Sequence, residues 1–267
     1  MNPKQITSQE NPKFKAALKL LSNRGRQQRD QIVIFGVRET LRAIDAGANI
    51  AEIYTCADIL KPEVFASAET RLATLGRPIW DLPLNLFTRL AYGDRVDGML
   101  AVAARPNSDL SRIALNKSPL VIVLESVEKP GNIGAVARSA DAIGATALIL
   151  ASPISDLFHP NSIRASLGCI FSLQTAVAES ETVKLWLLQN KLSIVAAEPD
   201  ANALYTTVDL KKPTAIVLGN EARGLSKIWT DDEVQCVRLP MRGLADSLNV
   251  SVTAAVMMFE AARQRIG

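Results

Sequence analysis

The sequence predicts an α/β protein, a fold class in which strands and helices alternate along the chain. Short runs rich in Val, Ile, Leu and Ala recur, separated by segments whose apolar residues have helical spacing. Uninterrupted apolar runs are typical of strands buried in a parallel sheet. A polar, proline-bearing stretch interrupts the pattern near residue 105. We therefore predict a small N-terminal α/β domain (1–105), a linker (106–118) and a C-terminal α/β domain with a parallel sheet (119–267).

The N-terminal domain is expected to begin with a helix at Asn11 and Pro12, because Asn caps helices and Pro fits their first turn. Further helices are predicted at residues 38–46, 62–75 and 84–91, and strands at 31–35, 51–56, 78–82 and 99–104.

In the C-terminal domain the same alternation predicts strands at 120–124, 147–151, 173–177, 193–197, 215–218 and 237–241. Helices are predicted at 132–143, 162–167, 181–189 and 248–265. The last helix carries Val252, Ala255, Val256 and Phe259 at helical spacing, a stripe typical of a core or a subunit interface.

Composition excludes several classes of protein. The 267 residues are 48% hydrophobic and 21% charged, as in globular proteins. The N-terminus lacks the apolar core of a signal peptide, and the apolar runs are too short for a membrane span. Three scattered cysteines fit a reducing cytoplasm, so we expect a cytoplasmic protein without disulfides. One histidine and no regular acidic cluster leave no expected metal site.

Positive charge gathers at the N-terminus. Residues 1–29 carry seven Lys and Arg side chains against the single acid Glu10. Such a cluster attracts a polyanion such as RNA or an anionic membrane surface, although a solvated helix face is the alternative. The predicted RNA contacts in this region are Lys13, Arg24, Arg26 and Arg29.

Two glycine-bearing loops follow predicted strands between residues 214 and 252. Polar residues at the carboxyl ends of neighbouring parallel strands predict one shared pocket, with two ordinary tight turns as the alternative. The spacing of Gly219 and Gly224 is that of a P-loop, but Leu225 replaces the lysine and Glu221 adds a negative charge. A phosphate-binding loop is therefore disfavoured.

A third glycine loop, residues 130–134, opens a helix that carries Arg138. From spacing alone, Arg138 is either a functional side chain near the sheet edge or a surface residue paired with Asp141. The single His159 cannot build a two-histidine zinc site, and no serine has the flanking glycines of a hydrolase elbow.

Three segments together resemble the motifs of the SpoU/TrmH branch of the SPOUT RNA methyltransferases. They are EKPGNIGAVARSADAIGA (128–145), IVLGNEARGLS (216–226) and LPMRGLADSLNVSVTAAV (239–256). The resemblance implies a deep trefoil knot in the C-terminal domain, a ribosomal-protein-like N-terminal domain that binds RNA, and a homodimer formed through the catalytic domain. It also implies S-adenosylmethionine as the cofactor.

The resemblance assigns residues to roles. The catalytic residues are expected to be Arg138, Asn132, Glu221, Ser247 and Asn249, and the cofactor is expected to contact Leu218, Gly219, Leu239, Met241, Leu248, Ala197 and Glu198. Arg138 is expected to anchor a phosphate and stabilise the forming alkoxide, because a guanidinium does not normally lose its proton; a literal base is the alternative. Arg164 is expected to bind phosphate or to reach across a dimer.

The implied reaction is methylation of a ribose 2′-hydroxyl in RNA, without a metal or a membrane. The accessory N-terminal domain favours large-subunit (23S) rRNA over tRNA as the substrate. One subgroup of the family confers resistance to a thiopeptide antibiotic, and the chain length is compatible with it. The alternatives are a tRNA methyltransferase, a catalytically idle RNA-binding or ribosome-assembly factor on the same fold, and a nucleotide-binding enzyme.

Overall fold

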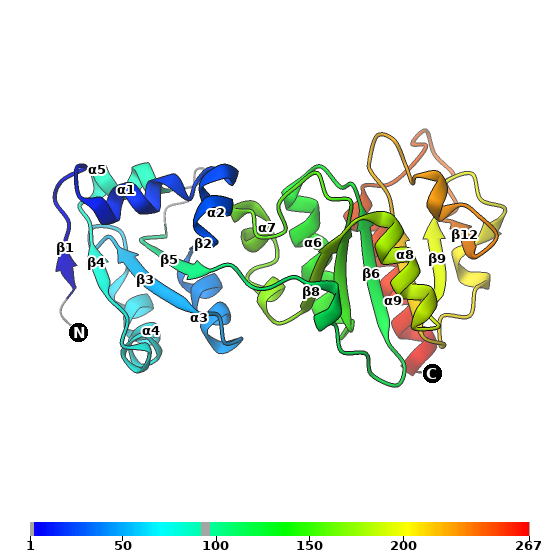
Figure 1. Cartoon of the computed structure of the whole chain (residues 1–267), viewed down its shortest axis with the longest axis horizontal. Coiled ribbons are helices and arrows are strands. Elements are labelled where there is room, and N and C mark those ends of the chain that lie inside the picture. Colours follow the sequence, from blue (N-terminus) through cyan, green and yellow to red (C-terminus); the bar gives the residue numbers. More distant parts are fainter. Residues whose placement is uncertain (1–2, 92–96, 267) are drawn as a thin grey trace. The chain divides into compact units, whose positions relative to one another are not determined.

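The computed structural model describes residues 3–91 and 97–266 (Figure 1). The chain divides into two compact units. The first comprises Met1–Pro106 and Phe158–Ser172, and the second Asn107–Leu157 and Leu173–Gly267. The division differs from the predicted domains at Phe158–Ser172, which the sequence placed in the C-terminal domain. This segment belongs to the first unit because its apolar side chains pack there, against β2 and α3.

The first unit contains a five-stranded mixed sheet in the order β1-β4-β3-β5-β2. Its strands are β1 (Lys4–Gln5), β2 (Gln31–Phe35), β3 (Ile50–Thr55), β4 (Ile79–Asp81) and β5 (Met99–Ala104). Its helices are α1 (Pro12–Lys19), α2 (Asn23–Arg29), α3 (Val37–Asp45), α4 (Pro62–Leu75), α5 (Leu84–Leu90), α7 (Pro160–Ala165) and the 3₁₀ turn η2 (Cys169–Phe171). Strand β5 pairs antiparallel with β2 and β3, so this sheet is not a parallel one.

The first helices show how the sequence sets local structure. Asn11 caps α1 by accepting a hydrogen bond from the Lys13 amide at 2.9 Å, as predicted. Helix α2 was not predicted, because NRGRQQR has no apolar stripe. It forms because Ser22 caps it and because Gly25 lies against the Lys19 carbonyl, where a Cβ would approach the oxygen to 1.8 Å.

Arg26 is a correction to the predicted RNA contacts. Its side chain is fully buried, and its guanidinium donates to the carbonyls of Leu20 and Leu21 at 3.1 Å. The residue therefore joins α2 to the end of α1 and does not face a ligand. Charge alone could not reveal this, because a charged side chain is buried when backbone carbonyls satisfy its donors.

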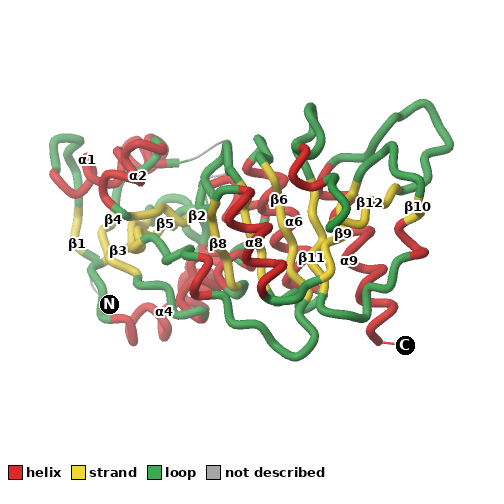
Figure 2. Tube along the Cα trace, turned by 45° about the vertical axis from the view of Figure 1, so that its right-hand side comes forward, coloured by secondary structure: helices red, strands yellow, loops and turns green. Residues whose placement is uncertain are grey.

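The second unit contains a seven-stranded parallel sheet in the order β10-β12-β9-β11-β6-β7-β8, which confirms the predicted fold class. Its strands are β6 (Leu120–Glu125), β7 (Ala147–Ala151), β8 (Gln174–Ala178), β9 (Ser193–Ala197), β10 (Ala203–Leu204), β11 (Thr214–Leu218) and β12 (Val234–Arg238). Figure 2 shows β8 and β10 at opposite edges of this sheet. Strand β12 begins at Val234, before the predicted start at Val237, and ends at Arg238, since Pro240 cannot donate to a strand ladder.

Helices cover both faces of the second sheet. They are α6 (Pro130–Ala142), α8 (Ser180–Gln189) and α9 (Val250–Ile266), with the 3₁₀ turns η1 (Leu110–Arg112), η3 (Tyr205–Thr207) and η4 (Lys227–Trp229). Helices α6 and α9 pack against each other, whereas α8 packs with η4 on the opposite face (Figure 1). Both faces are therefore buried, which explains the uninterrupted apolar sequence of strands such as β6.

The strand order brings distant loops together. The chain builds β6, β7 and β8 outward, crosses to β9, and returns to insert β11 between β9 and β6. Strand β12 then forms outside β9, and α9 returns to pack on α6 and β11.

The trefoil knot itself stays a prediction. No helix among residues 3–91 and 97–266 is both long and apolar enough to cross a membrane.

Candidate active site

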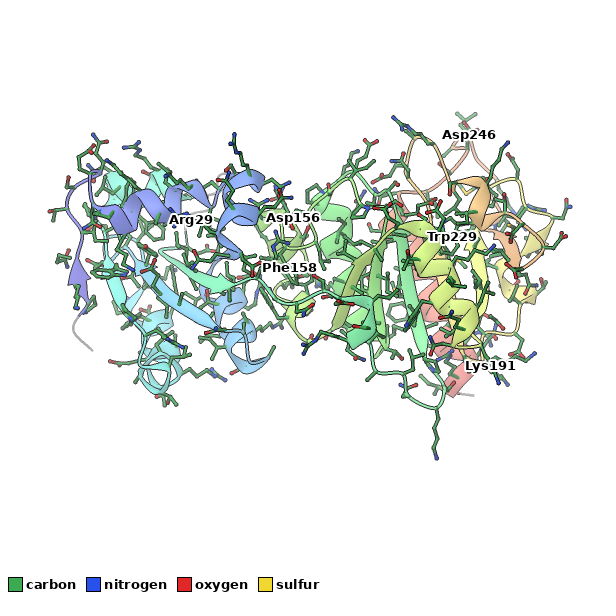
Figure 3. The ribbon with its side chains drawn as sticks, in the orientation of Figure 1. Arg29, Asp156, Phe158, Lys191, Trp229 and Asp246 are labelled. Atoms are coloured by element: carbon green, nitrogen blue, oxygen red, sulfur yellow. The ribbon has the colours of Figure 1, made fainter. Side chains whose placement is uncertain are left out.

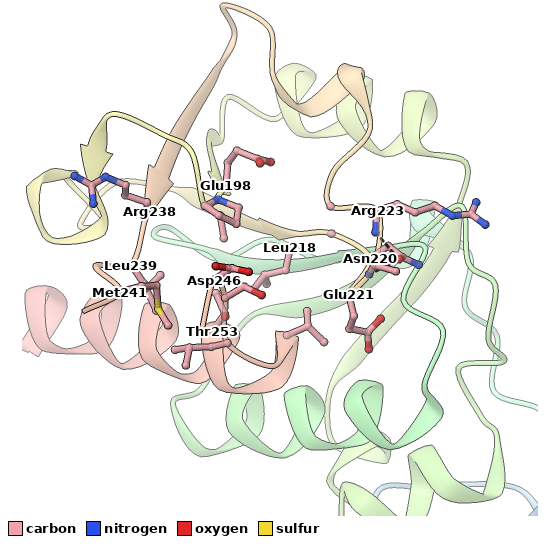
Figure 4. Close-up of a pocket in the computed structure, with 18 of the residues that line it drawn as sticks. Glu198, Leu218, Asn220, Glu221, Arg223, Arg238, Leu239, Met241, Asp246 and Thr253 are labelled. Carbon is pink, nitrogen blue, oxygen red and sulfur yellow. Dashed lines mark hydrogen bonds between the residues drawn. The ribbon is translucent and has the colours of Figure 1, made fainter. Parts of the chain in front are cut away.

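A cavity of about 330 Å³ lies at the carboxyl ends of β9, β11 and β12 (Figure 4). Its lining includes every residue predicted to contact the cofactor, namely Ala197, Glu198, Leu218, Gly219, Leu239, Met241 and Leu248. Val250 and Thr253 of α9 close one side. The loops that follow separate strands thus converge on one pocket, as expected at the carboxyl edge of a parallel sheet.

The loop after β11 is closed by its own backbone. The amide of Asn220 donates to the carbonyl of Gly224 at 3.0 Å, and the amide of Gly224 donates to the carbonyl of Asn220 at 2.9 Å. A Cβ on Gly219 would lie 2.5 Å from the Gly224 backbone, and Gly224 has a φ of +68°. Both glycines are therefore required by the tight turn that lines the pocket.

Asn220, which the sequence analysis did not assign, joins this loop to the loop after β6. Its side chain is buried and donates to the Ser126 carbonyl at 2.8 Å and to Glu128 Oε1 at 3.1 Å. Its Oδ1 accepts hydrogen bonds from the amides of Ala222 and Arg223 at 2.8 and 3.0 Å. The sequence signal for Asn220 was its position: it is a polar residue that follows the buried strand β11 after a single glycine and precedes Glu221.

Three of the predicted catalytic residues form a hydrogen-bonded chain. Asn132 at the start of α6 donates to Glu221, and Asn249 donates to Asn132 Oδ1 at 3.3 Å. The Oδ1 of Asn249 in turn accepts hydrogen bonds from the amide and the hydroxyl of Ser251, at 2.9 and 2.6 Å. Each of the three sequence motifs therefore contributes one side chain to a single cluster. Ser247 lines the same pocket as Glu221 of this cluster.

Arg138 stands apart from this cluster. It is exposed on α6, six residues after Asn132 and so about 9 Å further along the helix. Within the described part of the chain it makes no hydrogen bond or ion pair, so the alternative pairing with Asp141 is not formed. It is not part of the pocket lining. The guanidinium is thus available to a ligand that approaches from solvent.

The charges in the lining favour a cationic ligand. Three acids, Glu198, Glu221 and Asp246, accompany two arginines, Arg223 and Arg238. Figure 4 shows Asp246 in the middle of the lining, whereas both arginines extend away from it. Burial, reinforced by the negative charge of nearby Asp200, raises the pKa of Glu198. A positively charged ligand would relieve this cost, because an opposite charge favours the ionised carboxylate.

The predicted RNA contacts lie in the first unit. Lys13 is exposed on α1, where it forms an ion pair with Glu52 at 3.0 Å. Arg24 and Arg29 are exposed on α2, and Figure 3 labels Arg29. Arg164 is half-buried on α7. Among the residues that the structure describes, no three His, Cys, Asp or Glu side chains are grouped to hold a metal ion.

Comparison with known proteins agrees with this architecture. Residues 119–259 match the SpoU rRNA Methylase family, and the chain belongs to that family.

One relative is the 23S rRNA (uridine(2479)-2′-O)-methyltransferase of Streptomyces viridochromogenes, with 30% identity over 98% of this chain and 93% of that protein. The crystal structure of an RNA 2′-O ribose methyltransferase is 38% identical, covers 98% of this chain and 100% of its own, and gives a TM-score of 0.85. An AdoMet-bound rRNA methyltransferase from Sinorhizobium meliloti is 26% identical over 97% of each chain, with a TM-score of 0.87.

Proposed function

We propose that this protein transfers a methyl group from S-adenosylmethionine to a ribose 2′-hydroxyl in large-subunit 23S rRNA. The observation that carries the proposal is the cluster of Asn132, Glu221 and Asn249 beside a pocket with an excess of acidic side chains. Family membership and relatives that span nearly the whole chain support it. We also infer a cytoplasmic location, where such a substrate is found.

The pocket fits the cofactor by its chemistry. Leu218, Leu239, Met241 and Leu248 offer apolar surface, and the turn at Gly219 offers backbone groups. When bound, S-adenosylmethionine supplies an electrophilic methyl group on a cationic sulfonium. The acidic side chains in the lining suit that positive charge, and the apolar side chains exclude water from the reacting group.

The remaining task is to prepare the ribose hydroxyl. A guanidinium has a pKa above about 12 and normally stays charged. We therefore assign Arg138 to anchoring a neighbouring phosphate and stabilising the negative charge that develops on the 2′-oxygen. Asn132 and Asn249 would orient the ribose, with Glu221 holding Asn132 in place. Ser247 would face the same ribose from the pocket wall.

Ribosomal RNA is the favoured substrate because the first unit adds a basic surface to the catalytic unit. Exposed Lys13, Arg24 and Arg29 would contact phosphates, whereas buried Arg26 would not. Arg24→Ala should therefore weaken RNA binding and reduce its salt dependence without lowering Tm. Arg26→Ala should lower Tm instead. If instead Arg24→Ala lowered Tm without weakening RNA binding, and Arg26→Ala weakened RNA binding without lowering Tm, this surface would not be the RNA contact.

A homodimer is also proposed. Helix α9 exposes Val252 and Phe259, at 47% and 56% of their surface, on the side that also carries half-buried Val256. Such a stripe on a helix is typical of a subunit interface. Phe259→Asp should convert the dimer to a monomer in sedimentation, whereas Leu185→Asp on α8, a residue of equal exposure, should not.

The deciding experiment measures transfer of labelled methyl from S-adenosylmethionine to separate rRNA and tRNA pools. We expect alkali-resistant label in rRNA, lost in Arg138→Ala and kept in Arg112→Ala, an exposed arginine on η1. Label in tRNA alone would transfer the proposal to a tRNA methyltransferase. Cofactor binding with no label in either pool would favour an idle RNA-binding or assembly factor.

A further inference from the structure

Glu125, at the carboxyl end of β6, is a buried carboxylate that the proposed chemistry does not use. Its side chain is only 4% exposed and lies next to a largely apolar cluster. It accepts hydrogen bonds from Ser180 Oγ (2.8 Å), Ser226 Oγ (2.7 Å), Ser226 N (2.8 Å) and Trp229 Nε1 (2.8 Å). It is not part of the pocket lining. A buried charge of this kind persists only where its hydrogen bonds are made.

The geometry requires a carboxylate. Oε1 faces the indole N–H of Trp229, and Oε2 faces the backbone N–H of Ser226. Neither N–H can turn into an acceptor, whereas the two hydroxyls can rotate. The amide nitrogen of a glutamine would therefore meet a fixed donor in either of its two orientations. A glutamine at position 125 must lose one of these hydrogen bonds.

Two of the donor residues, Ser226 and Trp229, belong to the end of the pocket loop and the segment that follows it, whereas Ser180 lies on α8. Strand β11 enters this loop at Leu218, which pairs with Leu124, the neighbour of Glu125 on β6. The loop leaves at Ser226, where Glu125 holds both the amide and the hydroxyl. Trp229, fully buried and labelled in Figure 3, fixes the following turn to the same carboxylate. Both ends of the pocket loop are thus attached to the end of β6.

A second anchor holds the chain just beyond. Lys184 on α8, itself 6% exposed, forms ion pairs with Asp231 and with Glu233, the latter at 3.2 Å. The segment after the pocket loop is therefore attached to α8 at Asp231 and Glu233, and to Glu125 of β6 at Ser226. By contrast, the loop of residues 241–249 on the other side of the pocket is exposed throughout.

We propose that Glu125 is a positioning residue of the cofactor site: its carboxylate fixes Ser226 and thereby the pocket loop of residues 219–226, setting the affinity for the adenosyl cofactor. The proposal rests on the proposed function only in the identity of that ligand. Glu125 acts through Ser226 and Trp229 and touches neither ligand nor substrate.

The test uses the full chain and S-adenosylhomocysteine as the calorimetric probe. Glu125→Gln should weaken binding about tenfold or more, because one fixed N–H at the loop loses its acceptor. Trp229→Phe removes the fixed donor at Oε1. In the double variant the glutamine nitrogen can donate to the hydroxyls of Ser180 and Ser226, leaving its oxygen for the Ser226 amide. Affinity should then return to within about threefold of Trp229→Phe alone.

The matched control is Ser180→Ala, which removes a hydrogen bond from the same carboxylate but lies on α8, outside the loop. It should lower Tm and leave the affinity unchanged. Hydrogen exchange of the Ser226 amide gives a readout without ligand: it should quicken in Glu125→Gln and not in Ser180→Ala. Equal affinities in wild type and Glu125→Gln, an equal loss in Ser180→Ala, or no rescue in the double variant would overturn the proposal. Absence of binding by the wild type would instead refute the proposed cofactor, while the exchange result still decides the role of Glu125.

Discussion

The side-chain amide of Asn249 donates a hydrogen bond to Oδ1 of Asn132 at 3.3 Å, across 117 residues of sequence. Asn132 lies in the first turn of α6 and Asn249 precedes α9, two helices that pack together. Asn132 also donates to Glu221 from the loop after β11. The side chain of Asn132 thus joins three segments that lie far apart in the sequence: the start of α6, the loop after β11 and the loop before α9.

Asn132→Ala should therefore damage catalysis more than cofactor binding. The substitution leaves Glu221 and Asn249 without their shared partner, and the pocket lining does not include Asn132. We expect kcat to fall about a hundredfold, with the dissociation constant of S-adenosylhomocysteine changed less than about threefold. Steady-state kinetics and calorimetry check both values.

The control for this variant is Asn190→Ala, an exposed asparagine at the end of α8 that bonds only to the local carbonyl of Trp186 among the contacts described. It should leave kcat and cofactor binding unchanged. A kcat for Asn132→Ala within about threefold of wild type would remove Asn132 from the catalytic group.

Gly219→Ala should disrupt the pocket loop. The new Cβ would lie 2.5 Å from the backbone carbon and oxygen of Gly224, and backbone cannot move aside as a flexible side chain does. We expect the free energy of unfolding to fall by about 2 kcal/mol, and cofactor binding to be lost. Thermal denaturation with and without S-adenosylhomocysteine measures both effects.

Gly131→Ala is the matched comparison, because a Cβ at Gly131 on α6 meets nothing within 4 Å. Alanine is the better helix former, so this variant should be as stable as wild type or more so. If both glycine variants behaved alike, the close approach of Gly219 to Gly224 would not be the cause.

How much of this structure the sequence predicts depends on how far apart in the sequence the interacting residues lie. The strands of the second sheet were predicted because continuous apolar runs are a local signal, and α1 because its cap and Pro12 are adjacent. Helix α2 has neither an apolar stripe nor an adjacent proline. It depends on the contact of Gly25 with Lys19, which no periodicity reveals.

The same distinction applies to the site. The glycine loops and the pocket lining were predicted because their residues stand in recognisable short segments. Glu125 was not, since its partners Ser226 and Trp229 lie 101 and 104 residues away. Arg26 was predicted wrongly because a cluster of charges indicates exposure on average, and the burial of one member depends on carbonyls placed by the fold.

The stability of α9 should depend on pH through Glu260. Hydrogen bonds from Arg263 and Gln264 lower the pKa of this carboxyl from 4.5 to about 2. A lowered pKa means that the ionised form favours the folded state, so the contribution is complete above pH 4.5 and is lost as the pH falls through about 2. Glu260→Gln should therefore lower Tm at pH 7, and the difference from wild type should vanish towards pH 2.

Thermal denaturation of both proteins across this pH range tests the prediction. Glu181→Gln, at an exposed position on α8, serves as the control and should follow wild type at every pH. A Tm difference for Glu260→Gln that is constant with pH would assign the effect to packing of the side chain and not to its charge.

The segment Phe158–Ser172 lies within the family domain in sequence but belongs to the first unit. We therefore predict that the family domain does not fold stably without the first unit. Phe158, Ile163 and Ile170 are at most 1% exposed within the first unit. A chain of residues 107–267 retains these side chains but lacks the strand and helices that bury them, and exposed apolar clusters promote aggregation. We expect this fragment to aggregate, and a version with residues 158–172 replaced by a short Gly-Ser linker to stay monodisperse in light scattering. A soluble fragment of residues 107–267 that unfolds cooperatively would contradict this prediction. It would mean that the apolar side chains of residues 158–172 are buried even without the first unit.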